Sequence, residues 1–246
     1  MRKKIGFFNK ISTAALAIFL CVLPPMITAT EKGINQQEKE QQKQQSIWER
    51  DWDENERQRD ERFHIDKALD TIGIHPGMTV GEVGGGFGYL VFKLADCVGP
   101  RGKVYNEDIW EDALKLCQKR MEEKGYSNIE IILGTVEEPK LPKENLDYVF
   151  IHATMRFLEK PVELLNNIAP ALKPGGRLVI IEQEEGRAIG TSGDPVPPGF
   201  YRIKQEYFDL FSKTVFKVER IDITTLPYDI IFVLSVKSDN IQYNYY

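Results

Sequence analysis

Short apolar runs alternate with amphipathic segments along the middle of the chain. A strand is predicted where a short apolar run is bounded by glycine, proline or charged residues. A helix is predicted where apolar residues recur every three or four positions. On this basis the predicted strands are Thr79–Val83, Lys103–Asn106, Ile129–Leu133, Leu146–Ile151 and Arg177–Glu182. The predicted helices before and between them are Phe63–Ile72, Tyr89–Val98, 110–124 and Val162–Leu172.

The regular alternation stops after the fifth predicted strand. Residues 186–199 are rich in Gly, Pro and Ser, which is typical of a loop. A helix over 204–213 and two strands, Val215–Ile223 and Ile230–Val236, complete the pattern. It indicates a doubly wound α/β fold: a mostly parallel seven-stranded sheet with helices on both faces and a C-terminal antiparallel hairpin. Lys173-Pro174-Gly175-Gly176 is expected to form a tight turn before the fifth strand.

The N-terminal part has a different composition. Residues 1–29 begin with a basic stretch and continue with an apolar run, which predicts a signal peptide or a membrane anchor. Residues 30–46 are rich in Gln, Glu and Lys and predict a polar linker. The remaining predicted parts are an N-terminal helix over 47–62, the main domain over 63–238 and a tail over 239–246.

The predicted N-terminal helix carries Trp48 and Trp52 at helical spacing among charged residues. The simpler interpretation is that the two indole rings dock this helix on the main domain. The alternative is that the helix forms a lid over a substrate pocket, and both interpretations can hold together.

Composition and charge narrow the function classes. The 246 residues are 42% apolar, which is enough for a sizeable core, and their net charge of -5 gives no sign of a nucleic-acid partner. No Cys or His cluster has metal-ligand spacing, so no metal site is predicted. Cys97 and Cys117 could pair in an exported domain, but buried free thiols are the favoured interpretation.

A glycine-rich stretch, Gly84-Gly85-Gly86-Phe87-Gly88, follows the first predicted strand. Such a turn can bind a nucleotide-like ligand, because glycine lets the backbone approach it closely. The dinucleotide spacing G-x-G-x-x-G fails, since its last position falls on Tyr89 or Val91. An acid, Glu82, instead precedes glycines at every second position. This pattern resembles the first motif of the class I S-adenosylmethionine (SAM)-dependent methyltransferases.

Further segments, in the same order, extend the resemblance over about residues 63–236. The segment ending in Glu107-Asp108 is similar to the second motif, whose acid holds the ribose hydroxyls; Asp108 matches it, with Glu107 as the alternative. The Leu-Lys-Pro-Gly-Gly sequence that ends at Gly176 resembles the family's fifth-strand region. The Asn-Pro-Pro-Tyr motif of nucleic-acid amino-group methylators is absent after Ile151. Within the class, the chain most resembles the small-molecule and quinone-type branch.

The resemblance also implies roles for single residues. Glu82 would lie near the amino-acid part of SAM, the backbone of the glycine loop would lie against the cofactor, and Ile109 would pack on adenine. Thr135 and Val136 occupy the adenine-contact position after the third strand, but Thr135 replaces the usual acid, with Glu137 as a substitute. The implied cofactor-binding residues are Glu82, Gly84, Gly86, Gly88, Asp108, Ile109, Thr135 and Val136.

His152 is the candidate catalytic residue. It follows the fourth predicted strand, and an imidazole with its usual pKa of about 6.5 would suit a general base. The favoured alternative is a pocket-lining histidine without a proton role, because the sulfonium of SAM already activates the methyl group. Tyr201 and Tyr207, beside the predicted loop, are candidates to line an acceptor pocket.

The resulting expectation is a SAM-dependent methyltransferase that acts on a small molecule. The alternative is a non-catalytic module of the same fold that binds SAM, S-adenosylhomocysteine or another adenosine compound. The N-terminus adds a conflict. It predicts an exported protein, or one tethered to a membrane through residues 11–29, whereas SAM is made in the cytosol.

Overall fold

The computed structural model describes residues 51–183, 205–227 and 229–237. The chain divides into two compact units, 1–50 and 51–246, and every described residue belongs to the second. The predicted signal or anchor segment, the polar linker, Trp48, Tyr201 and the tail after Ser238 lie outside the described residues. In the described part of the chain, no helix has both the length and the apolar character needed to cross a membrane.

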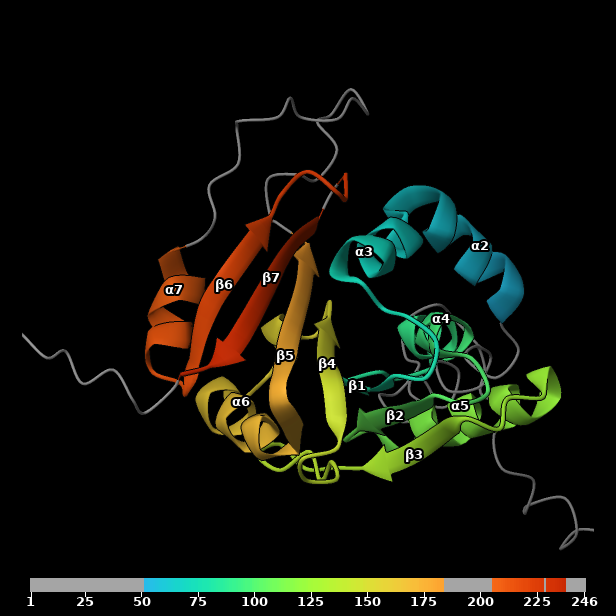
Figure 1. Ribbon diagram of the computed structural model, residues 1–246. Coiled ribbons are helices and arrows are strands. Elements are labelled where there is room, and N and C mark those ends of the chain that lie inside the picture. The colour runs from blue at the N-terminus through green and yellow to red at the C-terminus, as the bar shows by residue number, and fades with distance from the viewer. Residues whose placement is uncertain (1–50, 184–204, 228, 238–246) are drawn as a thin grey trace, which may run out of the picture. The chain divides into compact units, whose positions relative to one another are not determined.

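A seven-stranded sheet forms the centre of the second unit (Figure 1). Its order is β3-β2-β1-β4-β5-β7-β6; neighbours among β1 to β5 pair parallel, and β7 pairs antiparallel with both β5 and β6. The predicted α/β class with a C-terminal hairpin is thereby confirmed. The strands are β1 Thr79–Val83, β2 Lys103–Asp108, β3 Ile129–Leu133, β4 Leu146–His152, β5 Leu172–Gln183, β6 Phe216–Asp222 and β7 Asp229–Val236.

Helices cover both faces of this sheet. The α-helices are α2 Trp52–Phe63, α3 Ile65–Ile72, α4 Tyr89–Val98, α5 Glu111–Lys124, α6 Pro161–Ile168 and α7 Gln205–Ser212. Two short 3₁₀ helices, η1 Met155–Phe157 and η2 Ala169–Ala171, follow β4 and α6. In Figure 1, α3 and α4 lie on one side of the sheet and α6 and α7 on the other.

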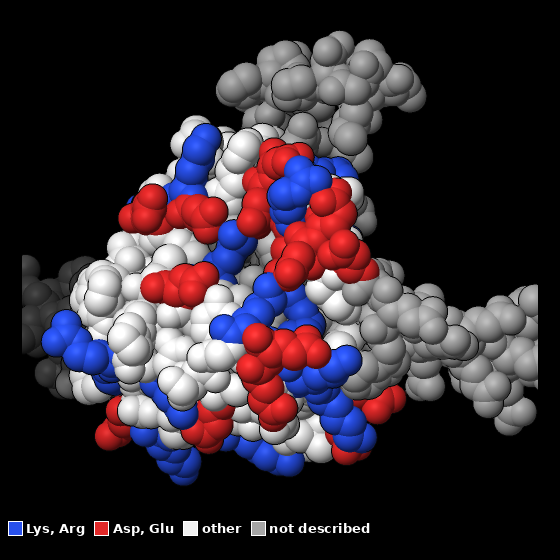
Figure 2. Space-filling view, turned by 90° about the vertical axis from the view of Figure 1, so that its right-hand side faces the viewer, with Lys and Arg blue, Asp and Glu red and all other residues white. Residues whose placement is uncertain are grey.

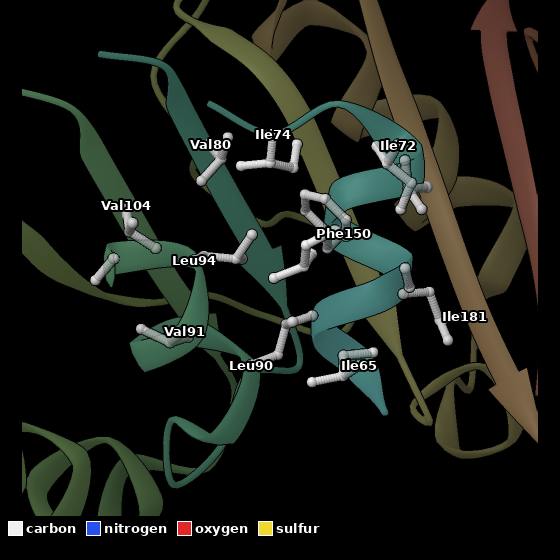
Figure 3. Packing of buried hydrophobic residues seen from close by; sticks show 14 of the residues in the cluster. Ile65, Ile72, Ile74, Val80, Leu90, Val91, Leu94, Val104, Phe150 and Ile181 are labelled. Carbon is white, nitrogen blue, oxygen red and sulfur yellow. The ribbon is translucent and has the colours of Figure 1, made fainter. Parts of the chain in front are cut away.

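Alternate strand residues build one core on each face, because successive side chains of a strand point in opposite directions. On the first face, the apolar stripes of α3 and α4 pack on Val80, Phe150 and Ile181 (Figure 3). On the second face, α6 and α7 cover Ile151 and Phe232. Each such buried aliphatic or aromatic side chain contributes roughly 1.5–3 kcal/mol, so these two layers fix the sheet.

The structure corrects two local predictions. Lys173–Gly176 is not a tight turn before the fifth strand but an irregularity inside β5, where Leu172 pairs with Leu146 and Arg177 already pairs with Tyr148. The extra residues bulge out at Gly175, whose φ of +86° disfavours any residue with a side chain. The predicted helix Phe63–Ile72 is broken at His64, whose left-handed backbone ends α2 and precedes α3.

The strand order reverses between β1 and β4, because the chain first adds β2 and β3 on one side of β1 and then crosses to the other. In open α/β sheets, ligands bind outside the carboxyl ends of the strands at such a switch point. The glycine loop follows β1 there, and Asp108 and His152 end β2 and β4. The fold therefore gathers the predicted site residues of three strands at one edge.

Candidate functional site

A cavity of about 320 Å³ lies at this edge, between the glycine loop, the end of β4 and helix α2. Of the predicted site residues, the cavity is lined by Glu82, Gly84, Gly86 and His152. The glycine loop and the loop after β4 also contribute Gly85, Phe87, Ala153 and Thr154 to the lining. Helix α2 adds Trp52, Asn55, Glu56 and Arg59.

The glycine loop is held by the strand beside it. The backbone N–H groups of Gly84 and Gly85 donate to the carbonyl of Glu107, at 2.8 and 3.0 Å. Gly84 has a φ of +78°, and a Cβ there would lie 2.4 Å from Cγ2 of Thr154. Only glycine fits this position, because both the backbone angle and the contact exclude a side chain. Gly88 caps α4 instead of lining the cavity, and a Cβ on it would meet the sulfur of Cys117.

Glu82 is buried at the end of β1, with 2% of its surface exposed. Its Oε2 has no hydrogen-bond partner among the described residues. Burial raises the pKa of Glu82 well above its usual value, and the nearby positive charge of Arg59 opposes that rise. A buried acceptor without a donor, facing a cavity, is suited to a ligand that supplies an N–H or O–H group.

Asp108 and Glu107 point to opposite sides of β2. The Asp108 carboxylate accepts one hydrogen bond from the Gly86 N–H and one from the Trp110 N–H, both at 2.8 Å. Glu107 is 1% exposed and abuts Gly134, away from the cavity. Asp108 therefore presents its carboxylate to the glycine loop, and the Glu107 carboxyl does not.

The predicted adenine contacts lie beyond the cavity lining. Ile109 is 56% exposed and follows directly after β2. Thr135 is exposed and engaged in its own turn, where its hydroxyl accepts from the Glu138 N–H at 3.0 Å. Val136 is half-buried, and Glu137 pairs with Lys160 instead of facing the cavity.

His152 lines the cavity at the end of β4, and its ring lies 5.9 Å from that of Tyr89. Burial, together with the charge of Arg59, lowers the pKa of His152 to about 3. The imidazole is therefore neutral at physiological pH and a much weaker base than a free histidine. Tyr207, a candidate for the acceptor pocket, packs on Phe211 and Phe232 in the second core and is not part of the cavity lining.

Helix α2 is attached to the glycine loop by aromatic and charged contacts. The Trp52 ring lies 4.7 Å from that of Phe87, in the middle of the loop. Arg120 of α5 is 4% exposed; it donates to the Phe87 carbonyl at 2.6 Å and to Glu56 of α2 at 2.5 Å. One buried guanidinium thus links three segments: the glycine loop, α2 and α5.

A second set of contacts joins α2 to α4. Asp60 accepts hydrogen bonds from the Tyr89 hydroxyl at 2.9 Å and from Lys93 at 2.8 Å. The Arg59 guanidinium lies over the Tyr89 ring, 3.8 Å from its centroid, which is cation–π geometry. These contacts make one wall of the cavity from a helix that has no buried residue of its own.

Sequence reasoning did not identify Arg59, Glu56 or Arg120 as site residues. In the sequence they stand among many other charged residues, and nothing in their spacing marks them. The face of the molecule on the right of Figure 1 also carries acidic and basic side chains side by side (Figure 2). The signal in this region was the pair Trp48 and Trp52, of which the structure describes Trp52, since a tryptophan within a charged helix needs an apolar partner.

Comparisons with known proteins agree with this geometry. Residues 74–195 match the family described as "Methyltransferase domain". The ubiquinone/menaquinone biosynthesis C-methyltransferase UbiE of Ectopseudomonas mendocina is 33% identical over 116 residues, which is 47% of this chain and 45% of that protein. The UbiE protein of Hahella chejuensis is 34% identical over 122 residues, 49% of this chain and 47% of the relative.

A solved structure is similar over more of the chain. A SAM-dependent methyltransferase from Aquifex aeolicus superimposes with a TM-score of 0.63 and 27% identity, covering 73% of this chain and 93% of that one. The chain spans about half the length of the curated relatives it matches. The family match, the sheet order and the glycine loop at the switch point agree, and over these residues the chain is similar to the class I SAM-dependent methyltransferases.

Proposed function

We propose that this protein transfers the methyl group of SAM to a small aromatic acceptor of the quinol or phenol type. The observation that carries the proposal is the cavity itself, because it joins the glycine loop and Glu82 on one side to His152, Thr154 and the aromatic wall on the other. The quinone-type acceptor is supported by the relatives, which are named as ubiquinone/menaquinone C-methyltransferases.

The residues present fit the cofactor. Glu82 offers a buried, unpartnered carboxylate oxygen to the amino group of its amino-acid part. Asp108, already oriented by the Gly86 N–H, presents a carboxylate for the ribose hydroxyls. Ile109 and Leu133, exposed at the ends of β2 and β3, offer apolar surface to the adenine. In this proposal Thr135 and Val136 border the adenine through their backbone, since the Thr135 hydroxyl is used in its turn.

The chemistry that SAM supplies when bound is an electrophilic methyl group on a sulfonium. The chain's own residues then have to orient the acceptor and exclude water. The rings of Trp52, Phe87 and Phe157 surround the cavity, and an aromatic acceptor would pack against them. Phe157 is 71% exposed, which is unusual for its type and is consistent with a surface that an acceptor covers.

His152 has a positioning role in this proposal. A base with a pKa of about 3 gains little from taking a proton at neutral pH, so general-base catalysis by this ring is disfavoured. Its neutral imidazole can instead accept a hydrogen bond from an acceptor hydroxyl, or donate one to it. The proposal therefore takes His152 as a pocket-lining histidine, which is the alternative that the sequence favours.

The test is isothermal titration of the full 246-residue chain, in mild detergent, with SAM and S-adenosylhomocysteine, and with NADH as the control. We expect micromolar binding of the first two, which corresponds to about -8 kcal/mol. Asp108→Ala should abolish this binding while the circular dichroism spectrum stays unchanged. A mutant that binds SAM normally would contradict the ribose assignment.

An acceptor screen should follow binding. Turnover of quinols or phenols would support the proposed reaction. Binding without turnover over a broad acceptor panel would instead favour the non-catalytic module.

The proposed location is outside the cytosol or at a membrane through residues 11–29. Fractionation of cells that produce the full chain tests this location, and a purely cytosolic protein would contradict it.

A further inference from the structure

Two side chains of opposite charge type, Glu82 and Arg59, line the cavity. Glu82 has a buried oxygen that no described residue satisfies. Arg59, on α2, has no carboxylate within ion-pair distance among the described residues. Four other cations that lie on α2 or contact it do have one: Arg57, Lys93, Arg120 and Lys124. An unpaired guanidinium at a cavity is a ready site for an anion.

The position of Arg59 is fixed by the ring beneath it. The guanidinium lies 3.8 Å from the centroid of Tyr89, and the Tyr89 hydroxyl is held by Asp60, one residue further along α2. Stacking leaves the edge of the guanidinium, with its N–H donors, free to bind a carboxylate in the ring plane. Arg59 is also close enough to influence the pKa values of Glu82 and His152, so all three share one electrostatic environment.

An acidic and a basic group that face one cavity match a zwitterion. An α-amino acid carries an ammonium and a carboxylate on the same carbon, and the amino-acid part of SAM has this form. We propose that Arg59 binds the α-carboxylate of the cofactor while Glu82 binds its α-amino group. This inference rests on the proposed function, and it adds that helix α2 completes the cofactor site and selects a cofactor that keeps its carboxylate.

The assignment has a direct consequence for specificity. Decarboxylated SAM retains the sulfonium, the adenosine and the amine, and lacks only the carboxylate. The wild-type chain should bind SAM about tenfold to a hundredfold more tightly than decarboxylated SAM, since a hydrogen-bonded charge pair is worth that much. Arg59→Gln should remove this preference by weakening SAM binding alone.

The experiment is titration calorimetry of the full chain with SAM and with decarboxylated SAM, for the wild type and three variants. Arg59→Gln is the test, and Arg59→Lys, which keeps the positive charge, should recover part of the preference. Arg57→Gln is the matched control: Arg57 lies on the same helix, its side chain is 61% exposed, and among the described residues it forms ion pairs with Glu54 and Glu61. It should bind both compounds as the wild type does. Thermal melts without ligand check that each variant is folded.

The outcomes separate the two proposals. A selective loss of SAM affinity in Arg59→Gln supports the carboxylate contact. An equal loss for both compounds would overturn it, because Arg59 would then act only through the docking of α2 on Tyr89; an unchanged affinity would overturn it as well. A wild-type chain that binds both compounds equally would refute the carboxylate contact and leave the cofactor in place. A folded wild type that binds neither compound would refute the proposed function itself.

Discussion

Glu107 gives the sharpest test of the burial argument, because its energetic effect depends on pH. The side chain is 1% exposed, and its Oε1 has no hydrogen-bond partner among the described residues. Burial, with a smaller effect of the neighbouring Asp108 charge, raises the pKa of Glu107 from its usual 4.5 to about 8. The folded protein therefore keeps the proton over a range in which the unfolded chain releases it.

The sign of the effect follows from this difference. A carboxyl whose pKa is raised by folding lowers the free energy of unfolding as the pH rises from about 4.5 to about 8. Each pH unit in that window costs about 1.4 kcal/mol, so the cost at pH 7 is about 3 kcal/mol. Glu107→Gln keeps the shape of the side chain and has no charge to lose. It should be more stable than the wild type by about 3 kcal/mol at pH 7 and by less than about 1 kcal/mol at pH 5.

The assay is urea unfolding at several pH values between 5 and 8, followed by far-UV circular dichroism. The quantity that decides is the difference in unfolding free energy between Glu107→Gln and the wild type, because other titrating groups cancel in it. Glu130→Gln is the control: Glu130 is an exposed acid on β3, paired with Lys103, and its removal should matter by less than about 0.5 kcal/mol at every pH. A Glu107→Gln difference that stays constant with pH would refute the reasoning.

Three further predictions concern the wall of the cavity. Arg120→Met should lower the free energy of unfolding, measured in urea, by about 3 kcal/mol, because it leaves the Glu56 charge without its partner. Adding Glu56→Gln to the same chain should restore part of this loss. If the effects of the two substitutions are simply additive, the pairing is contradicted. Gly84→Ala should cost at least about 2 kcal/mol more than Gly73→Ala, because both glycines have positive φ but a Cβ meets neighbours only at Gly84. The imidazole signal of His152, assigned by its loss in His152→Gln, should keep its neutral chemical shift as the pH is lowered to about 4; a midpoint near 6.5 would contradict the burial of the ring.

The sheet and the glycine loop were predictable because each is encoded locally. The bounds of β1, β3 and α4 agree with the sequence pattern, since apolar runs and flanking glycines determine them over a few residues. The bulge at Gly175 was not predictable, because a Lys-Pro-Gly-Gly sequence is equally typical of a turn, and only pairing with β4 decides between the two.

The site was predictable on the strand side and not on the helix side. Glu82 and Asp108 stand at the ends of apolar strands, so their positions follow from the fold class. Arg120 pairs with Glu56 across 64 residues, and no local period connects the two. In the sequence both stand among many other charged residues, so a buried pair cannot be distinguished from a surface one.

The contrast between α2 and α3 has a consequence for how the cavity opens. Helix α3 buries Ile65, Ala68, Leu69 and Ile72 in the core, and its removal would expose the sheet. Helix α2 buries no residue and is held by ion pairs, a stacked guanidinium and one tryptophan. Apart from the buried Arg120–Glu56 pair, contacts of this kind cost less to break than a core layer, because water can replace most of them. A cavity bounded on one side by α2 can therefore exchange a ligand without disturbing the sheet that positions Glu82 and Asp108.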